Sequence, residues 1–346
     1  MDFCAIDTNG MPAWKALRLL PFRPQFQSLR GLMRAIQKTT QMTRGWGSRA
    51  LVLAGVLATS GFLASDIGFA AAAATPVEVP RAIFTDPPAD PAHPAKSTVL
   101  HIPSHGVLIN GLMYSPPGVG PYPTLVICHG LPGNEKNLDL AQAVRRSGWN
   151  AVTFNYRGSW GSPGVFRFKQ TIEDAASVLA YLREPATAAR LGVDTRRIAM
   201  AGHSMGGWVT VHTAAHDHDL VGAILISAAD MGGAGATQRE RLIAHMADDM
   251  ETLSGVTAES MADELRRNTK EFRFDNAVSG LTHMPLLAMT SDDGLAPDVD
   301  VMVQAIKAKG GTGVTEIHMP TDHVWSDHRI AMESSILTWL ARLGTP

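Results

Sequence analysis

The residue whose setting points most clearly to catalytic chemistry is Ser204, which lies between glycines in the sequence GHSMG at residues 202–206. An apolar run, 197–201, precedes this pentapeptide, and a second apolar stretch, 207–212, follows it. Strand, sharp turn and helix in that order are the context in which a G-x-S-x-G serine acts as a nucleophile. The glycines permit a tight turn that would present the Ser204 hydroxyl at the start of the helix, where free backbone N–H groups favour negative charge.

Two later segments carry an acid and a base in the order that such a serine requires. Residues 285–297 read as a strand that ends in an acidic turn with Asp292 and Asp293, and residues 317–328 read as a strand followed by a loop with His323. A serine hydroxyl becomes a useful nucleophile when a base accepts its proton and an acid orients that base. The order serine, acid, histidine therefore predicts acyl-transfer chemistry.

The elements that must position these residues alternate between strand and helix. Hydrophobic runs without internal alternation are typical of parallel strands that are buried on both faces. Such runs occur at 99–102, 107–114, 124–129, 151–156, 197–201, 222–227, 285–290 and 315–319. Longer amphipathic stretches, which we interpret as helices, lie at 138–147, 172–184, 209–215, 299–309 and 330–343. The pattern predicts an α/β fold with right-handed crossovers, in which the serine turn and both later loops share one sheet edge.

One insertion interrupts this alternation. Residues 228–284 contain two helix-like segments, 237–253 and 258–272, with several exposed charges. Their place in the chain lets them fold over the carboxyl edge of the sheet, where active sites of α/β proteins lie. We interpret the insertion as a small cap, and an ordinary exposed helix pair is the alternative.

Charge divides the 346-residue chain into two parts. Residues 1–75 carry eight lysines and arginines against three acids, which leaves 22 basic and 29 acidic residues in the remainder. The acidic balance of the remainder argues against a nucleic-acid partner, because no basic stripe is left to neutralise phosphates. With 45% hydrophobic and 18% charged residues, the composition suits a globular enzyme with one sizeable core.

The first 75 residues resemble an export leader. Basic residues in 44–49 precede an apolar stretch at 50–64, and small residues at 70–74 supply cleavage sites, which predicts a signal peptide and a secreted or periplasmic protein. An uncleaved membrane anchor is the alternative, although 15 apolar residues are short for a span of about 20. The proline- and alanine-rich residues 76–97 then read as a linker.

From about residue 98 to the end, the chain resembles the α/β-hydrolase superfamily. The turn 293–297 matches its D-x-x-x-P position for the acid, and the Asp-His pair at 322–323 matches its T-D-H position for the base. The resemblance implies an eight-stranded, mostly parallel sheet flanked by helices, with 228–284 as a helical cap. It favours Asp293 as the acid, with Asp292 as a rival, and His323 as the base. His318 and His328 are then a strand-surface and a helix-start histidine.

The same resemblance assigns an oxyanion hole and a neighbouring segment. Residues 129–133, HGLPG, are similar to the family's H-G-x-P-G loop, which implies that the N–H groups of Leu131 and Met205 stabilise the oxyanion. The segment 155–164 is similar to the family's N-x-R-G-x-G-x-S-x-G sequence. In and after it, Trp160, Phe166 and Phe168 either line a substrate pocket or pack in the core.

Two further sequence patterns do not match a known metal-binding or phosphate-binding motif. His212, His216 and His218 have helical spacing, but the glutamate of an H-E-x-x-H metal site is missing, so we interpret them as histidines at a helix end. The glycine-rich segment 232–235 has no phosphate-binding pattern and is expected to be a loop.

These residues together predict a serine hydrolase that cleaves carboxylic esters through Ser204, His323 and Asp293 and an acyl-enzyme, with no metal or organic cofactor. A prolyl-oligopeptidase-like peptidase or amidase, acting on short peptides or amides, and a thioesterase are the nearest alternatives. A non-catalytic binding module on a hydrolase scaffold is the alternative from a different class.

Overall fold

The computed structural model describes residues 79–343. The predicted signal peptide, the anchor alternative and the start of the linker lie outside these residues. No helix within 79–343 is long and apolar enough to cross a membrane.

The described part of the chain forms one eight-stranded sheet with the strand order β1-β2-β4-β3-β5-β6-β7-β8. Its strands are β1 (Lys96–Ser104), β2 (Val107–Ser115), β3 (Tyr122–Cys128), β4 (Asn150–Phe154), β5 (Val193–His203), β6 (Leu220–Ile226), β7 (Leu286–Ser291) and β8 (Val314–Met319). β2 pairs antiparallel with both β1 and β4, and all the pairs from β4 to β8 are parallel. Every expected strand forms, and the predicted mostly parallel sheet is confirmed.

Burial explains why these strands could be recognised. All residues of the inner strands β4 and β7 are buried, so both faces need apolar side chains and the sequence shows a continuous run. β1 lies at the edge and alternates between exposed and buried positions along its second half, as expected where one face meets water.

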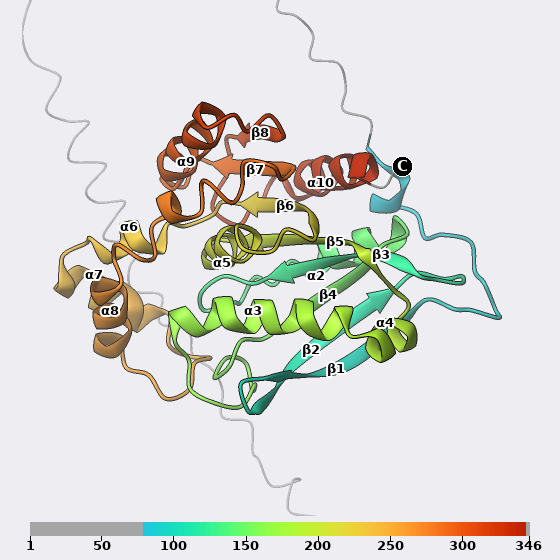
Figure 1. The fold of residues 1–346 in the computed structure, drawn as a ribbon, viewed down its shortest axis with the longest axis horizontal. Helices are drawn as coiled ribbons and strands as arrows, with labels where there is room; N and C mark the ends of the chain where they lie inside the picture. Colours follow the sequence, from blue (N-terminus) through green and yellow to red (C-terminus); the bar gives the residue numbers. More distant parts are fainter. Residues whose placement is uncertain (1–78, 344–346) are drawn as a thin grey trace, which may run out of the picture. The chain divides into compact units, whose positions relative to one another are not determined.

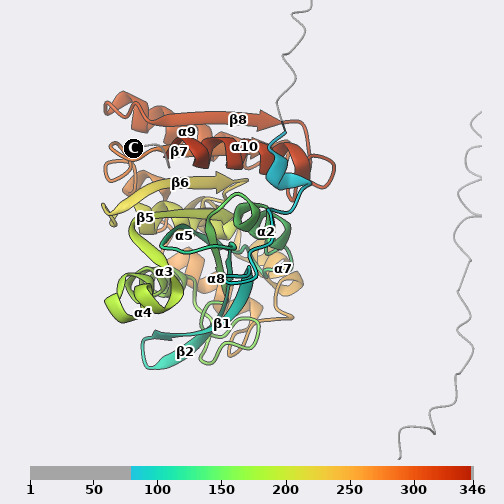
Figure 2. The same cartoon turned by 90° about the vertical axis from the view of Figure 1, so that its right-hand side faces the viewer.

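Helices cover both faces of the sheet (Figures 1 and 2). α2 (Leu138–Arg146) and α10 (Arg329–Leu343) pack in one hydrophobic cluster, whereas α3 (Phe168–Arg183), α5 (Met205–Ala214) and α9 (Ala296–Ala308) contribute to the other. The short helix α4 (Pro185–Leu191) was not expected from the sequence. It begins where the Glu184 side chain accepts hydrogen bonds from the N–H groups of Ala186 and Thr187, with a proline in its first turn.

The insertion 228–284 forms α6 (Met231–Gly235), α7 (Arg239–Asp248), α8 (Ala258–Arg267) and the 3₁₀ helix η3 (Phe274–Asn276). In Figure 1 the helices α6 to α8 lie beyond the ends toward which β6 and β7 point. The expectation of a loop at 232–235 was wrong, because these glycines belong to α6. A Cβ on Gly232 would lie 2.4 Å from the Arg273 nitrogen, and one on Gly235 would lie 2.4 Å from the Leu265 carbonyl oxygen. The glycines therefore serve close packing against α8 and the segment that follows it.

The described part of the expected linker lies against the domain. It includes the 3₁₀ helix η2 (Arg81–Ile83), and the Arg146 guanidinium donates a 3.1 Å hydrogen bond to the carbonyl of Ile83. The N–H of Gly118 bonds the carbonyl of His93 at 2.8 Å. Backbone groups of this proline-rich segment are thus satisfied by the folded domain.

Candidate active site

Ser204 occupies the turn between β5 and α5 in a rare backbone conformation. Its φ of 58° and ψ of −123° place a residue with a side chain in the positive-φ region, which costs about 1–3 kcal/mol. The turn is possible because its flanking positions are glycines. A Cβ on Gly202 would lie 1.9 Å from the Gly206 carbonyl oxygen, and one on Gly206 would lie 2.1 Å from that of Cys128. Any side chain at either position would open the turn.

The backbone around Ser204 holds the strained turn in place. Its N–H donates to the carbonyl of Ile226 at 3.1 Å, and its own carbonyl accepts the N–H of Gly207 at 2.9 Å and of Ala229 at 3.1 Å. Ser204 immediately precedes α5, so negative charge on its hydroxyl oxygen would lie near the positive end of that helix.

Asp293 and His323 meet across the carboxyl edge of the sheet. The Nδ1 atom of His323 lies 2.7 Å from Oδ2 of Asp293, and the Asp293 side chain is only 4% exposed. Burial by itself would raise the pKa of this carboxyl. Hydrogen bonds from His323, the Leu295 N–H and the Ser291 hydroxyl outweigh that effect and lower the pKa below its usual value. Asp293 is thus held as a carboxylate beside the imidazole.

The neighbouring acid points elsewhere. Oδ1 of Asp292 lies 3.1 Å from Nε2 of His318, and both side chains are more than half exposed. The remaining candidate base, His328, pairs with the exposed Asp327 at 2.8 Å. Of the two acids and three histidines that the sequence offered, only Asp293 and His323 line the cavity that Ser204 lines.

His203 lies beneath His323, a contact that the sequence did not indicate. Its Nε2 atom lies 2.8 Å from the carbonyl oxygen of His323, and the two rings are 4.6 Å apart. Burial lowers the pKa of His203 to about 4, so this ring is neutral near pH 7. A neutral Nε2–H that donates to the His323 carbonyl would tie the histidine loop to the end of β5.

The two residues expected to form the oxyanion hole line one cavity with Ser204. Leu131 and Met205 line the same cavity as the serine, and Met205 is the first residue of α5, so its N–H has no carbonyl one turn earlier in the helix. The Leu131 loop is braced by the Tyr156 hydroxyl, which donates to the carbonyl of His129 at 3.1 Å.

A cavity of about 600 Å³ opens over these groups. Ser204, Asp293 and His323 line it together with residues of α6, α7 and the turn before α9. Its apolar lining consists of Leu131, Met205, Ala229, Met231, Ala234, Met246 and Leu295, and its further acidic lining consists of Asp230, Asp249 and Asp298. The inserted segment therefore supplies much of the wall facing the serine.

The three aromatic side chains considered for a substrate pocket do not line this cavity. Phe166 and Phe168 are fully buried in the core and pack edge to face with ring centres 5.3 Å apart. Trp160 lies at the surface, where its indole N–H donates to the carbonyl of Pro132 at 2.8 Å and Lys136 lies over its ring. Phe166 and Phe168 therefore follow the packing alternative, and Trp160 lies against the Pro132 loop rather than in this cavity.

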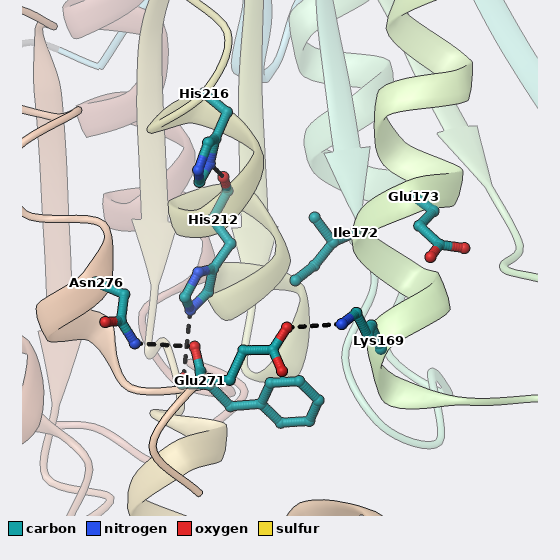
Figure 3. A pocket seen from close by; sticks show the side chains of 8 residues that line it. Lys169, Ile172, Glu173, His212, His216, Glu271 and Asn276 are labelled. Atoms are coloured by element: carbon teal, nitrogen blue, oxygen red, sulfur yellow. Dashed lines mark hydrogen bonds and ion pairs between the residues drawn. The ribbon is translucent and has the colours of Figure 1, made fainter. Parts of the chain in front are cut away.

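A second cavity, of about 380 Å³, lies between α3, α5 and the segment after α8 (Figure 3). His212 and His216 line it, but both are engaged locally. Nε2 of His212 lies 3.3 Å from the carbonyl oxygen of Phe272, and Nδ1 of His216 lies 2.8 Å from the carbonyl oxygen of His212. Within residues 79–343, no group of three or more histidine, cysteine or acidic side chains is arranged to hold a metal ion.

Comparisons with curated proteins give partial matches. The chain is 29% identical over 126 residues to an uncharacterized protein of Mycobacterium tuberculosis, a match that covers 36% of this chain and 43% of that protein. It is 30% identical over 127 residues to the quorum-quenching protein AidA of Acinetobacter baumannii, covering 35% of this chain and 40% of AidA. The matches thus span less than half the length of these relatives.

Solved structures share the fold at low sequence identity. The carboxylesterase EstE1, cloned from a metagenomic library, aligns with a TM-score of 0.55 and 20% identity over 77% of this chain and 93% of its own. The esterase of Pyrobaculum calidifontis aligns with a TM-score of 0.55 and 19% identity over 74% of this chain and 88% of its own. The alpha/beta hydrolase family model matches residues 125–332, which is more than half of the sequence. With this match and the observed sheet, the chain belongs to the alpha/beta hydrolase family.

Proposed function

We propose that this protein is a serine hydrolase that cleaves carboxylic esters through an acyl-enzyme on Ser204. The observation that carries the proposal is the pairing of His323 with a buried Asp293 at 2.7 Å in a cavity that Ser204 also lines. Nucleophile, base and orienting acid are the three groups that serine acyl transfer requires.

In the first step, the imidazole of His323 accepts the Ser204 proton as the serine oxygen attacks the ester carbonyl. Asp293 holds Nδ1 of the ring and stabilises the imidazolium that forms. The protonated ring then donates its proton to the departing alcohol, and a water molecule activated by the same ring releases the acid. Ser204 Oγ has no hydrogen-bond partner among the described residues, so the proposed mechanism requires the serine–histidine contact to form in the substrate complex.

The tetrahedral intermediate needs donors where its negative charge develops. We assign this role to the N–H groups of Leu131 and Met205, two residues that line the cavity with Ser204, with support from the N-terminal end of α5. The neutral ring of His203 also suits the mechanism, because it adds no positive charge beside the imidazolium of His323.

The choice between ester and amide chemistry is tested with matched substrates. We expect 4-nitrophenyl esters of short fatty acids to be hydrolysed with a kcat/KM at least about 100-fold above that of aminoacyl 4-nitroanilides, since apolar side chains form much of the lining and suit a fatty acyl chain. Faster turnover of the anilides would favour the peptidase alternative. No turnover of either class, nor of acyl thioesters, would favour the binding module.

The lining of the cavity also predicts a charge preference. Asp230, Asp249 and Asp298 line it, and among its described lining residues there is no lysine or arginine. Burial raises the pKa of both Asp230 and Asp249, so a nearby positive charge would favour their ionised forms. Asp230 pairs with Arg273 at 3.1 Å and Asp249 lies 3.9 Å from His245, whereas the Asp298 side chain has no ion-pair partner among the described residues.

We therefore expect discrimination among 4-nitrophenyl esters that differ in acyl charge. At low salt, an ester with a trimethylammonium group on its acyl chain should exceed the neutral ester of equal length in kcat/KM by about tenfold, and a hemiester with a free carboxylate should fall below it. Asp298→Asn and high salt should both shrink the difference. A preference for the anionic ester would contradict this reading of the cavity.

A further inference from the structure

The Pro132 carbonyl oxygen, in the loop that carries Leu131, accepts hydrogen bonds from two side chains of separate segments. The indole nitrogen of Trp160, between β4 and α3, donates to it at 2.8 Å, and the hydroxyl of Thr252, between α7 and α8, donates at 3.1 Å. The two donors also contact each other, because the Trp160 N–H donates to the Thr252 carbonyl at 3.0 Å. We call this closed set of three hydrogen bonds the Pro132 clamp.

The chemistry of these groups fixes the direction of every bond in the clamp. An indole N–H and a backbone N–H can only donate, and a carbonyl oxygen can only accept, so the Thr252 hydroxyl must be the donor toward Pro132. A carbonyl oxygen has two lone pairs and can accept both side-chain bonds at once. Loss of one donor therefore leaves the other in place, whereas loss of both leaves the Pro132 carbonyl without support from these two segments.

Trp160 is held for this contact by its backbone and by its ring. Its φ of 48° lies in the left-handed region that residues with side chains seldom adopt, and such a conformation persists where the surrounding structure imposes it. The Lys136 ammonium lies 4.0 Å from the centre of the indole ring and donates to Oδ1 of Asn155 at 3.0 Å. Nδ2 of Asn155 in turn donates to the Trp160 carbonyl at 3.3 Å. The indole is thus fixed against the loop from which Lys136 comes.

Thr252 connects the inserted segment to the same loop, and its neighbours strengthen the connection. Nδ2 of Asn134 donates to Oε1 of Glu251 at 2.9 Å. The Ser254 N–H donates to the Gly158 carbonyl at 2.7 Å, which joins the insertion to the loop after β4. The clamp therefore lies where three separate loops meet.

The clamp lies outside the candidate active-site cavity, yet residues close to it in the chain reach that cavity. None of the three clamp residues lines the cavity, whereas Leu131 and Asp249 do. Leu131 directly precedes Pro132, and Asp249 lies three residues before Thr252. A change in the clamp can thus be felt in the wall around the reacting groups without any direct contact with substrate.

The Pro132 carbonyl lies close along the chain to the Leu131 N–H, a donor that we assign to the oxyanion hole. The proline ring fixes φ of Pro132 and the peptide bond between the two residues is planar, so only ψ of Pro132 and the two dihedral angles of Leu131 are free between them. On the other side, Nδ1 of His129 lies 2.8 Å from the carbonyl oxygen of Gly130, which belongs to the peptide group that carries the Leu131 N–H. The chain around this N–H is thus held from both ends.

We propose that Trp160 and Thr252 are positioning residues for the oxyanion hole. Through the Pro132 carbonyl they hold the Leu131 N–H where the negative charge of the tetrahedral intermediate develops. The proposal rests on the proposed function of Ser204 and on the oxyanion role of Leu131. An oxyanion donor stabilises the transition state more than the bound ester, so the clamp should act on kcat and leave KM nearly unchanged.

The first test compares Thr252→Val, Trp160→Phe and the variant that carries both substitutions with the wild-type protein on a 4-nitrophenyl ester. Valine keeps the shape of threonine and phenylalanine keeps an aromatic ring, so each substitution removes one donor to the Pro132 carbonyl. Both bonds lie near the surface, where water competes, so we expect each single variant to lower kcat about threefold and the double variant about tenfold, with KM changed by less than about twofold. Thr252→Ser keeps a hydroxyl and should retain wild-type kcat.

The second test uses an alkylboronic acid, which binds a nucleophilic serine as a tetrahedral adduct that resembles the intermediate. In each variant the Ki of this inhibitor should rise by the same factor by which kcat/KM falls, because both quantities depend on the Leu131 N–H. A loss of kcat with an unchanged Ki would overturn the proposal, since the oxyanion hole would then be intact.

Thr282→Val is the matched control, because the hydroxyl of Thr282 also donates to a backbone carbonyl, that of Ser279 at 3.0 Å, in the segment before β7. It should leave kcat and Ki unchanged. Wild-type kcat in the double variant, an equal loss in Thr282→Val, or a loss in Thr252→Ser as large as in Thr252→Val would overturn the proposal. If Trp160→Phe does not fold, Thr252→Val and Thr252→Ser decide the question alone. Failure of the proposed function is recognised separately, since the wild-type protein would then hydrolyse no ester.

Discussion

Ser204→Ala is expected to lower kcat for ester hydrolysis by about 10⁴-fold or more, because it removes the hydroxyl on which the proposed acyl-enzyme forms. Alanine differs from serine only by the hydroxyl, and it retains the same backbone strain at a φ of 58°. The variant should therefore keep the thermal midpoint of the wild-type protein within a few degrees while losing turnover. Initial rates with a 4-nitrophenyl ester, together with thermal unfolding, measure both quantities.

The control for this prediction is Ser334→Ala, which removes a buried serine hydroxyl that donates to the carbonyl of Ile330 in α10. It should retain wild-type turnover. Ser204→Ala with more than about a tenth of wild-type kcat would show that another group is the nucleophile.

A second large effect is expected from the acid turn, where two adjacent aspartates differ in their surroundings. Asp293→Asn should lower kcat by about 10⁴-fold, because an amide can neither hold the imidazole in the required tautomer nor stabilise its charged form. Asp292→Asn should change kcat by less than about threefold, since this side chain is 64% exposed and faces His318. Side-by-side kinetics of the two purified variants measure the difference.

The two substitutions are matched in chemistry and adjacent in sequence, so each serves as the control for the other. A large loss in Asp292→Asn with a small one in Asp293→Asn would reverse the assignment of the acid. Small and equal losses of kcat in both variants would show that neither carboxylate takes part in the mechanism.

The strands could be predicted because strands that are buried on both faces appear in the sequence as continuous apolar runs. β4 and β7 are buried along their whole length, so their apolar runs are uninterrupted. The residues of the candidate site could also be picked out, since Ser204, Asp293 and His323 each follow a strand that ends at the same edge of the sheet.

What the sequence did not reveal depends on contacts between distant segments. The glycine-rich sequence of α6 is typical of a loop, and the reason for its glycines is the close packing of Leu265 and Arg273 against them. Aromatic residues such as Phe166 and Phe168 are found both in substrate pockets and in cores. Their exposure of 0% in the structure places them in the core. Such outcomes are decided by tertiary packing, which local patterns do not encode.

The supporting residues of the site are missed for the same reason. His203 was visible only as the variable position of the G-x-S-x-G sequence, and its contact with the His323 carbonyl joins residues 120 positions apart. The bonds from Trp160 and Thr252 to the Pro132 carbonyl join residues 28 and 120 positions apart. Threonine, tryptophan and histidine are common in loops, so the sequence alone does not indicate that these residues lie close together in the fold.

The central claim, that Ser204 is the nucleophile of a serine hydrolase, is tested most directly by covalent labelling. The wild-type protein is treated with a fluorophosphonate probe and digested with trypsin, and the peptide spanning residues 198–239 is sequenced by tandem mass spectrometry. The account predicts one phosphonyl group on Ser204, with loss of ester hydrolysis in proportion to labelling and no label in Ser204→Ala. A native protein that hydrolyses esters but is unlabelled, or that carries the label on another residue, would contradict it.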